Sequence, residues 1–160
     1  MEDNHNYVQV LIETLQKQVM VLQDILKLTQ EQSAIAGQSD FNEVMLEESL
    51  NKKEVLIAKL NELDDGFTAV YGRVRSEVMN KQELYRDELK MMQSLIKQCT
   101  DLGVEIKVLE ERNREKLAQC FANQQKKYGS KRTAASVASR YHQTMNNRKA
   151  MDSYFFNQKN

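Results

Sequence analysis

Ser49 and Lys52 have the spacing of a Ser-x-x-Lys motif, in which the lysine helps the serine hydroxyl to act as an acylating nucleophile. Enzymes that use this motif also carry Ser-Asp-Asn and Lys-Thr-Gly motifs, and neither occurs in this sequence. We therefore interpret the match as chance and predict no nucleophile at Ser49.

Metal and acid–base chemistry are poorly supported as well. His5 lies at the N-terminal fringe and His142 far away in a basic segment, so they form no His-x-x-His pair, and the repeated Glu-x-x-His pattern of ferritin-like bundles is absent. Neighbouring carboxylates such as Glu110 and Glu111 point about 100° apart on a helix, so we expect such pairs to face solvent. No glycine-rich phosphate loop is present. We predict no catalytic, metal or cofactor site, and hence no enzyme.

The composition favours long helices. The 160 residues include no proline, no tryptophan and only five glycines. Sandwiches, barrels and doubly wound sheets need many turns, which proline and glycine usually make. We expect an all-α protein.

The charge is divided unequally along the chain. Residues 1–122 carry 22 acidic and 15 basic residues, a net charge of −7, whereas residues 123–160 carry eight basic residues and Asp152, a net charge of +7. No apolar run exceeds four residues and the first residues are polar and acidic, so we expect a cytoplasmic protein without membrane insertion. Cys99 and Cys120 lie about 30 Å apart if one helix carries both, so we expect them not to pair.

Apolar residues recur at alternating spacings of four and three along three segments, as on one face of a helix. We expect helices over about 6–36, 41–76 and 80–127. The members of the three stripes are Val8, Ile12, Leu15, Val19, Leu22 and Leu26; Leu56, Leu60, Leu63, Phe67, Val70 and Val74; and Met92, Leu95, Cys99, Leu102, Ile106 and Leu109.

Local signals predict the helix ends. Gly37 is expected to end the first helix in the left-handed conformation, and Asp40 with Glu43 to cap the second. Asn80 with Glu83 is expected to cap the third helix, although a bent continuation is an alternative.

The stripes also predict how the helices associate. The second stripe keeps its phase through Gly66, so we expect that helix to continue through it. Asn113 falls on the third stripe, where a polar residue can fix the register of a coiled coil. We predict an elongated antiparallel three-helix coiled-coil bundle over residues 1–128, with a flexible or helical C-terminal tail over 129–160.

The basic tail carries a weak apolar stripe. Its members are Ala134, Val137, Ala138, Tyr141 and Met145. We weigh a nucleic-acid arm, which the acidic body opposes, a fourth helix folded on the bundle, and a helix that binds in a partner's apolar groove. We favour the partner-binding tail and predict no nucleic-acid partner. A docked tail that a partner releases would combine the last two alternatives.

The chain resembles the FlgN-type flagellar export chaperones, which are small helical proteins of the bacterial cytoplasm. The likeness runs from about Val8 to Tyr128. The matching features are Ser39-Asp40-Phe41 before the second helix, Lys53-Glu54 with Leu56, Leu60 and Leu63, then Glu111-Arg112-Asn113 with Leu117, and finally Tyr128-Gly129. The longer tail ending in Tyr154-Phe155-Phe156 departs from the family pattern.

This resemblance implies a chaperone that binds hook-associated (hook–filament junction) proteins before type III secretion. In the family, the C-terminal segment binds amphipathic terminal helices of the cargo and keeps the cargo unpolymerised. A tyrosine at the position of Tyr128 helps to engage the export gate of the flagellar export apparatus. Two alternatives remain: a chaperone of the filament cap protein, and a self-assembling coiled-coil structural or adaptor protein whose copies form a homodimer or larger oligomer.

Overall fold

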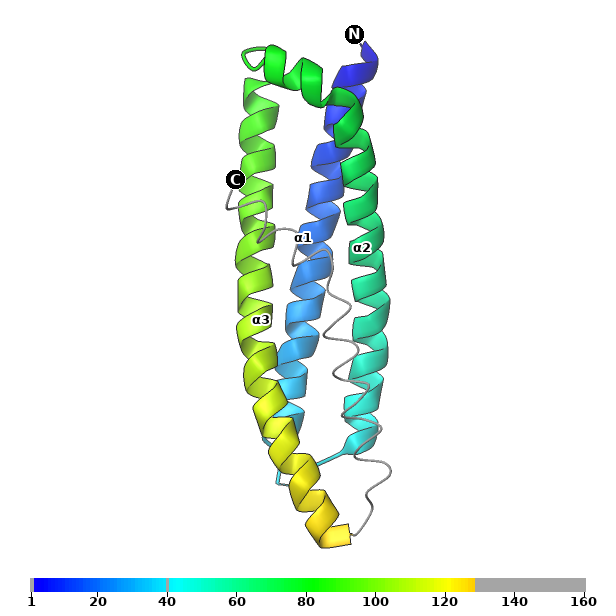
Figure 1. Cartoon of the computed structure of the whole chain (residues 1–160), viewed down its shortest axis with the longest axis vertical. Coiled ribbons are helices and arrows are strands. Elements are labelled where there is room, and N and C mark those ends of the chain that lie inside the picture. The colour runs from blue at the N-terminus through cyan, green and yellow to red at the C-terminus, as the bar shows by residue number, and fades with distance from the viewer. Residues whose placement is uncertain (1, 40, 129–160) are drawn as a thin grey trace.

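The computed structural model describes residues 2–39 and 41–128. This part of the chain forms three helices, α1 (Glu2–Ala36), α2 (Glu43–Asn80) and α3 (Arg86–Tyr128), with no strand among the described residues. Successive helices run in opposite directions along one rod (Figure 1). The expected all-α bundle is confirmed. The tail that we predicted over 129–160 lies outside the described residues.

The helix α1 is the centre of the packing. It contacts α2 along one side and α3 along the other, whereas the backbones of α2 and α3 hardly approach each other. Figure 1 shows α2 and α3 on either side of α1, with the end of α3 extending beyond the connection between α1 and α2. The rod is therefore built as two helix pairs that share α1.

The connection between α1 and α2 differs from its sequence prediction. Gly37 donates its amide to the Ser33 carbonyl at 3.1 Å but does not adopt a left-handed φ. Because the bond from the Gln38 amide to the Ile35 carbonyl completes this last turn, a left-handed residue is not needed. The N-cap of α2 is Asn42, whose Oδ1 accepts bonds from the amides of Val44 and Met45, and not the predicted Asp40.

The helix α2 continues through Gly66 as expected, but it ends at Asn80 and the next helix begins only at Arg86. Asn80 therefore belongs to α2 and does not cap α3. The Lys81 amide closes α2 on the Glu77 carbonyl at 2.9 Å, and the side chain of Tyr85 is buried in the connection. A buried aromatic residue fixes the path of this turn, which the capping pattern alone does not reveal.

The buried apolar residues form three clusters along the rod. The first cluster lies at the end where α2 meets α3 and includes Val8, Leu11, Ile12, Leu15, Val74, Val78, Tyr85 and Met92. The middle cluster includes Val19, Val21, Leu22, Ile25, Ile57, Leu60, Cys99 and Ile106. The last includes Ile35, Ala36, Leu46, Leu50, Leu117 and Phe121.

Neither cysteine forms a disulfide, as the sequence predicts. Cys99 is buried in the middle cluster, and burial raises the pKa of the half-buried Cys120 thiol. Among the helices described here, none has an apolar stretch long enough to cross a membrane.

Candidate functional site

The residues that the sequence predicts for partner binding lie at and beyond the end of α3. Tyr128 is the last residue of α3, but its side chain lies outside the described part of the structure. Ala134, Val137, Ala138, Tyr141 and Met145 lie outside it entirely. The candidate site is therefore built from what the rod presents next to the start of this tail.

A buried ion pair joins α2 to α3. Lys53 Nζ lies 2.7 Å from Glu110 Oε1, and the two side chains are only 1% and 0% exposed. The prediction that Glu110 faces solvent is therefore wrong. Glu110 continues the apolar stripe of α3, and its lysine partner across the bundle compensates the buried carboxylate.

The helix α1 completes this ion pair with hydrogen bonds. Lys53 Nζ donates to Gln32 Oε1 at 3.1 Å, and Gln32 Nε2 donates to Ser49 Oγ at 3.2 Å. The Ser49 hydroxyl in turn donates to the Leu46 carbonyl at 2.7 Å. All three helices thus contribute to one hydrogen-bonded network.

Asn113 adds a second set of contacts between α1 and α3. Its side chain is fully buried, its Nδ2 donates to the Thr29 carbonyl at 2.9 Å, and its Oδ1 accepts from the Ser33 hydroxyl. The expected place of Asn113 in the helix interface is confirmed. We name Gln32, Ser49, Lys53, Glu110 and Asn113, with Thr29 and Ser33, the polar layer.

The polar layer lies between the middle and last apolar clusters. The ion pair and the hydrogen bonds of the layer can form in only one register of the three helices. If one helix shifted by a turn along the others, the buried polar groups would lose their partners. Lys53 is not a member of the predicted apolar stripe, although it falls between Leu50 and Ile57 in the four-three spacing of α2. The polar layer therefore fixes the alignment of the three helices. Its buried groups bond to one another and do not form a substrate site.

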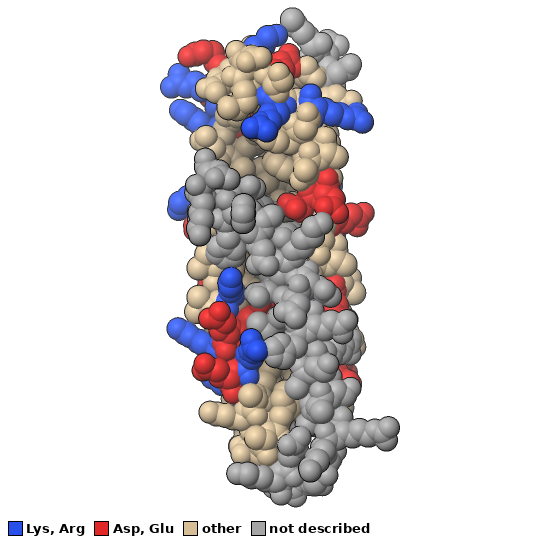
Figure 2. All heavy atoms as spheres, in the orientation of Figure 1, with Lys and Arg blue, Asp and Glu red and all other residues tan. Residues whose placement is uncertain are grey.

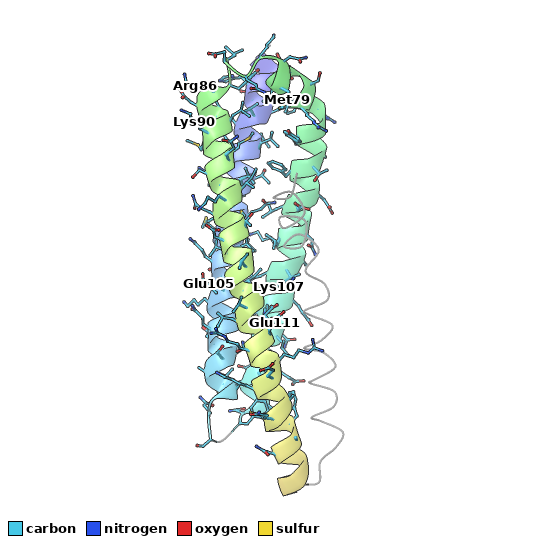
Figure 3. All side chains as sticks on the ribbon, turned by 60° about the vertical axis from the view of Figure 1, so that its left-hand side comes forward. Met79, Arg86, Lys90, Glu105, Lys107 and Glu111 are labelled. Carbon is cyan, nitrogen blue, oxygen red and sulfur yellow. The ribbon has the colours of Figure 1, made fainter. Side chains whose placement is uncertain are left out.

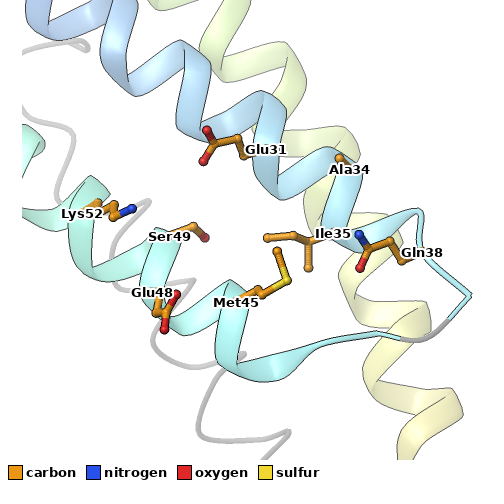
Figure 4. A pocket seen from close by; sticks show the side chains of 8 residues that line it. All are labelled: Glu31, Ala34, Ile35, Gln38, Met45, Glu48, Ser49 and Lys52. Carbon is orange, nitrogen blue, oxygen red and sulfur yellow. The ribbon is translucent and has the colours of Figure 1, made fainter.

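A groove between α1 and α2 is the second feature of the site. One hollow of about 260 Å³ is lined by Glu31, Ala34, Ile35, Gln38, Met45, Glu48, Ser49 and Lys52 (Figure 4). A second hollow of about 450 Å³ shares Glu31 and Lys52 with the first and continues along the rod past Leu28, Val55 and Leu56. The two hollows form one groove near the end of the rod where the described chain stops.

The groove is suited to apolar side chains. Met45 is 45% exposed and Val55 is 68% exposed, while charges of both signs surround them. Large exposed apolar residues in a hollow are typical of contact surfaces between proteins. The mixed charges of Glu31, Glu48 and Lys52 favour no strongly charged ligand.

The face shown in Figure 2 is unevenly charged. Acidic side chains gather over α2 and, mixed with basic ones, over the lower half of α3, whereas most of the side chains coloured at the end where α2 meets α3 are basic. The end of the rod nearest Tyr128 is the opposite one (Figure 1). The basic tail therefore starts far from the basic end of the rod.

No group of three His, Cys, Asp or Glu side chains in the described part of the chain is placed to hold a metal ion. His5 approaches Glu88 at 3.7 Å and remains 61% exposed. Comparison of the chain with protein-family models, with curated proteins and with solved structures finds no match.

Proposed function

We propose that this protein is a chaperone of flagellar type III export. It binds amphipathic terminal helices of hook-associated proteins in the cytoplasm and keeps them unpolymerised until export. The family resemblance of residues 8–128 supports this assignment, and the rod supplies the physical basis for helix binding.

The observation that carries the proposal is the open packing of the three helices. The helices α2 and α3 pack on α1 and hardly on each other, so each outer helix packs on a single described neighbour. On the side of α2 away from α3, apolar residues such as Met45 and Val55 remain exposed along the α1–α2 groove. An amphipathic helix binds along an apolar groove of this kind, because the groove covers the apolar face of the helix.

The tail provides the second binding element. Ala134, Val137, Ala138, Tyr141 and Met145 recur as the anchors of one helix face. A helix with so few apolar residues is marginal alone and gains stability on a partner's helix. The tail and a cargo helix would then cover each other's apolar faces.

Replacing two of these anchors tests the proposal. Val137→Ala with Tyr141→Ala should weaken binding to a purified hook-associated protein by about 2–4 kcal/mol, measured by titration calorimetry. The matched control is Ser136→Ala with Gln143→Ala on the opposite face of the same helix, which should change the affinity little. Equal affinities for the two variants would place cargo binding elsewhere. Preferential binding of the filament cap protein would assign the chain to the neighbouring chaperone family.

Tyr128 is proposed to contact the export gate. Tyr128→Ala should leave the calorimetric affinity for cargo unchanged and reduce the amount of cargo exported by flagellated cells. Loss of both would mean that Tyr128 stabilises the end of α3 instead.

One observation favours self-assembly as a second candidate. Val104 and Val108 lie one turn apart on α3 and are 42% and 44% exposed. Two copies could pair through this face. A stable oligomer of the chain alone at micromolar concentration, measured by sedimentation, would favour this candidate over the chaperone.

A further inference from the structure

A polar stripe runs along one side of α2. Five polar residues and one alanine follow spacings of four and three, with three acids and no base: Glu47, Asn51, Glu54, Ala58, Asn61 and Asp65. Met45 and Lys52, on the opposite side of the helix, line the groove against α1. Lys53 points between these two sides and reaches Glu110 of α3. The polar stripe therefore lies on the side of α2 next to α3.

The helix α3 presents a matching side. Asn113 forms a hydrogen bond to α1, and Glu110 pairs with Lys53 of α2. Around the axis of α3, the residues on the side of Glu110 that is away from Asn113 therefore face away from α1. These residues are Ile96, Thr100, Gly103, Lys107 and Arg114. Figure 3 shows Lys107 on the side of α3 toward α2 and Glu105 on the other side. We name the face between this side of α3 and the polar stripe of α2 the seam.

The seam lies between the two helices that pack least on each other. The backbones of α2 and α3 hardly approach each other, and only long side chains such as Lys53 and Glu110 span the distance between them. Thr100, Gly103 and Ala58 are small, so a helix with small residues on its own face can approach closely. Bundles of four helices fill such a face with the last helix.

Charge identifies the occupant. The segment 131–149 contains five basic residues and no acidic residue, and its apolar stripe includes the small residues Ala134 and Ala138. The α3 side of the seam carries the basic residues Lys107 and Arg114, whereas the first half of α2, residues 43–65, carries seven acidic and three basic residues. The acidic side of the seam is therefore that of α2. We propose that residues 131–149 of this chain dock as a helix along the seam in the free protein, with their basic side chains beside the polar stripe of α2.

The chain has the length for this docking. The helix α3 ends at Tyr128, seven residues beyond Phe121 in the last apolar cluster, which is about 10 Å beyond it at 1.5 Å per residue. The 32 residues that follow can span about 48 Å as a helix, whereas Glu47 to Asp65 covers about 27 Å. After a short turn, the tail can reach the whole polar stripe.

This docking concerns the free chain and does not depend on the identity of the cargo. Where the proposed function also holds, cargo must displace the tail from the seam, because the same apolar stripe cannot face the rod and the cargo together. A failure of cargo binding would leave the docking standing, and a failure of docking would leave cargo binding standing.

Hydrogen–deuterium exchange on the full chain tests the proposal. At low salt, amides of residues 131–149 should exchange about ten-fold or more slowly than in an unstructured chain. The triple variant Glu47→Lys, Glu54→Lys and Asp65→Lys should lose this protection, and 1 M salt should weaken it in the wild type. The matched control Glu13→Lys, Glu31→Lys and Glu105→Lys adds the same charge away from the seam and should keep it.

A change in the tail separates docking from damage to the rod. The tail variant combines Lys131→Glu, Arg132→Glu and Arg140→Glu. On the wild-type rod it should abolish the protection of the amides of residues 131–149. Combined with the seam variant, Glu47→Lys, Glu54→Lys and Asp65→Lys, it should restore that protection. Circular dichroism checks that each rod remains helical. An unprotected tail in the wild type, equal protection in the seam and control variants, or no restoration by the combined charge swap would overturn the proposal.

Discussion

Lys53 Nζ on α2 lies 2.7 Å from Glu110 Oε1 on α3, in a part of the rod where neither side chain reaches solvent. The pair links two helices whose backbones hardly touch, and Gln32 of α1 accepts a further bond from the lysine at 3.1 Å. The contact therefore favours one alignment of α2 and α3 along α1.

Removing the lysine should destabilise the rod strongly. Lys53→Met leaves Glu110 buried without its cation and should lower the free energy of unfolding by about 3–5 kcal/mol in urea titrations. Lys53→Met with Glu110→Leu should recover most of this loss, because no buried charge remains. Lys52→Met, at the exposed neighbour, should change stability by less than about 0.5 kcal/mol. Equal effects at positions 52 and 53 would contradict the role of the pair.

Asn113 should contribute through its two contacts with α1. Asn113→Ala removes the bond to the Thr29 carbonyl and the acceptor of the Ser33 hydroxyl, and it should cost about 1–3 kcal/mol in the same titration. Asn123→Ala, at an exposed position of the same helix, serves as the control and should cost little. A neutral Asn113→Ala would mean that water replaces both contacts.

Two glycines in α2 should be replaceable with a gain in stability. A Cβ at Gly66 or Gly72 would meet no atom within 4 Å, and alanine favours the helix by about 1 kcal/mol at each position. Gly66→Ala and Gly72→Ala should each raise the Tm by several degrees in a thermal melt. Gly37→Ala, outside the helix, should give no comparable gain. A drop in Tm at Gly66 or Gly72 would show that the helix needs glycine for another contact.

Cys120 should react slowly in the folded protein. Because burial raises the pKa of its thiol, less thiolate is present at a given pH than in the unfolded chain. We expect the rate of alkylation by iodoacetamide, measured by mass spectrometry, to increase with pH in both states. For Cys120 in the folded chain, this increase should begin at a higher pH than in the urea-unfolded chain. The associated stability is complete below the unfolded pKa and is lost as the pH rises through the folded pKa. Identical pH profiles for the folded and unfolded chains would contradict this.

The sequence predicts the fold well where one helix face repeats. The four-three stripe carries α2 through Gly66 and places Asn113 in the interface, and both are confirmed. The acidic pair of Glu110 with Glu111 predicts solvent exposure for both, and this is wrong for Glu110. Its position between Ile106 and Asn113 on the stripe of α3 is the signal that indicates burial.

The remaining differences have local causes. Asp40 and Asn42 both suit an N-cap, and only the geometry of the connection selects Asn42. Tyr85 buries its ring in a turn that has no periodic pattern. The candidate anchors Val137 and Tyr141 lie outside the described residues, so their place in the site stays a prediction.

Sedimentation velocity of the chain mixed with a purified hook-associated protein tests the proposed function most directly. We predict a defined 1:1 complex and suppression of the polymers that the hook-associated protein forms alone. The account would be contradicted if the cargo polymerised equally with and without the chain while the chain sedimented unchanged as an oligomer of its own.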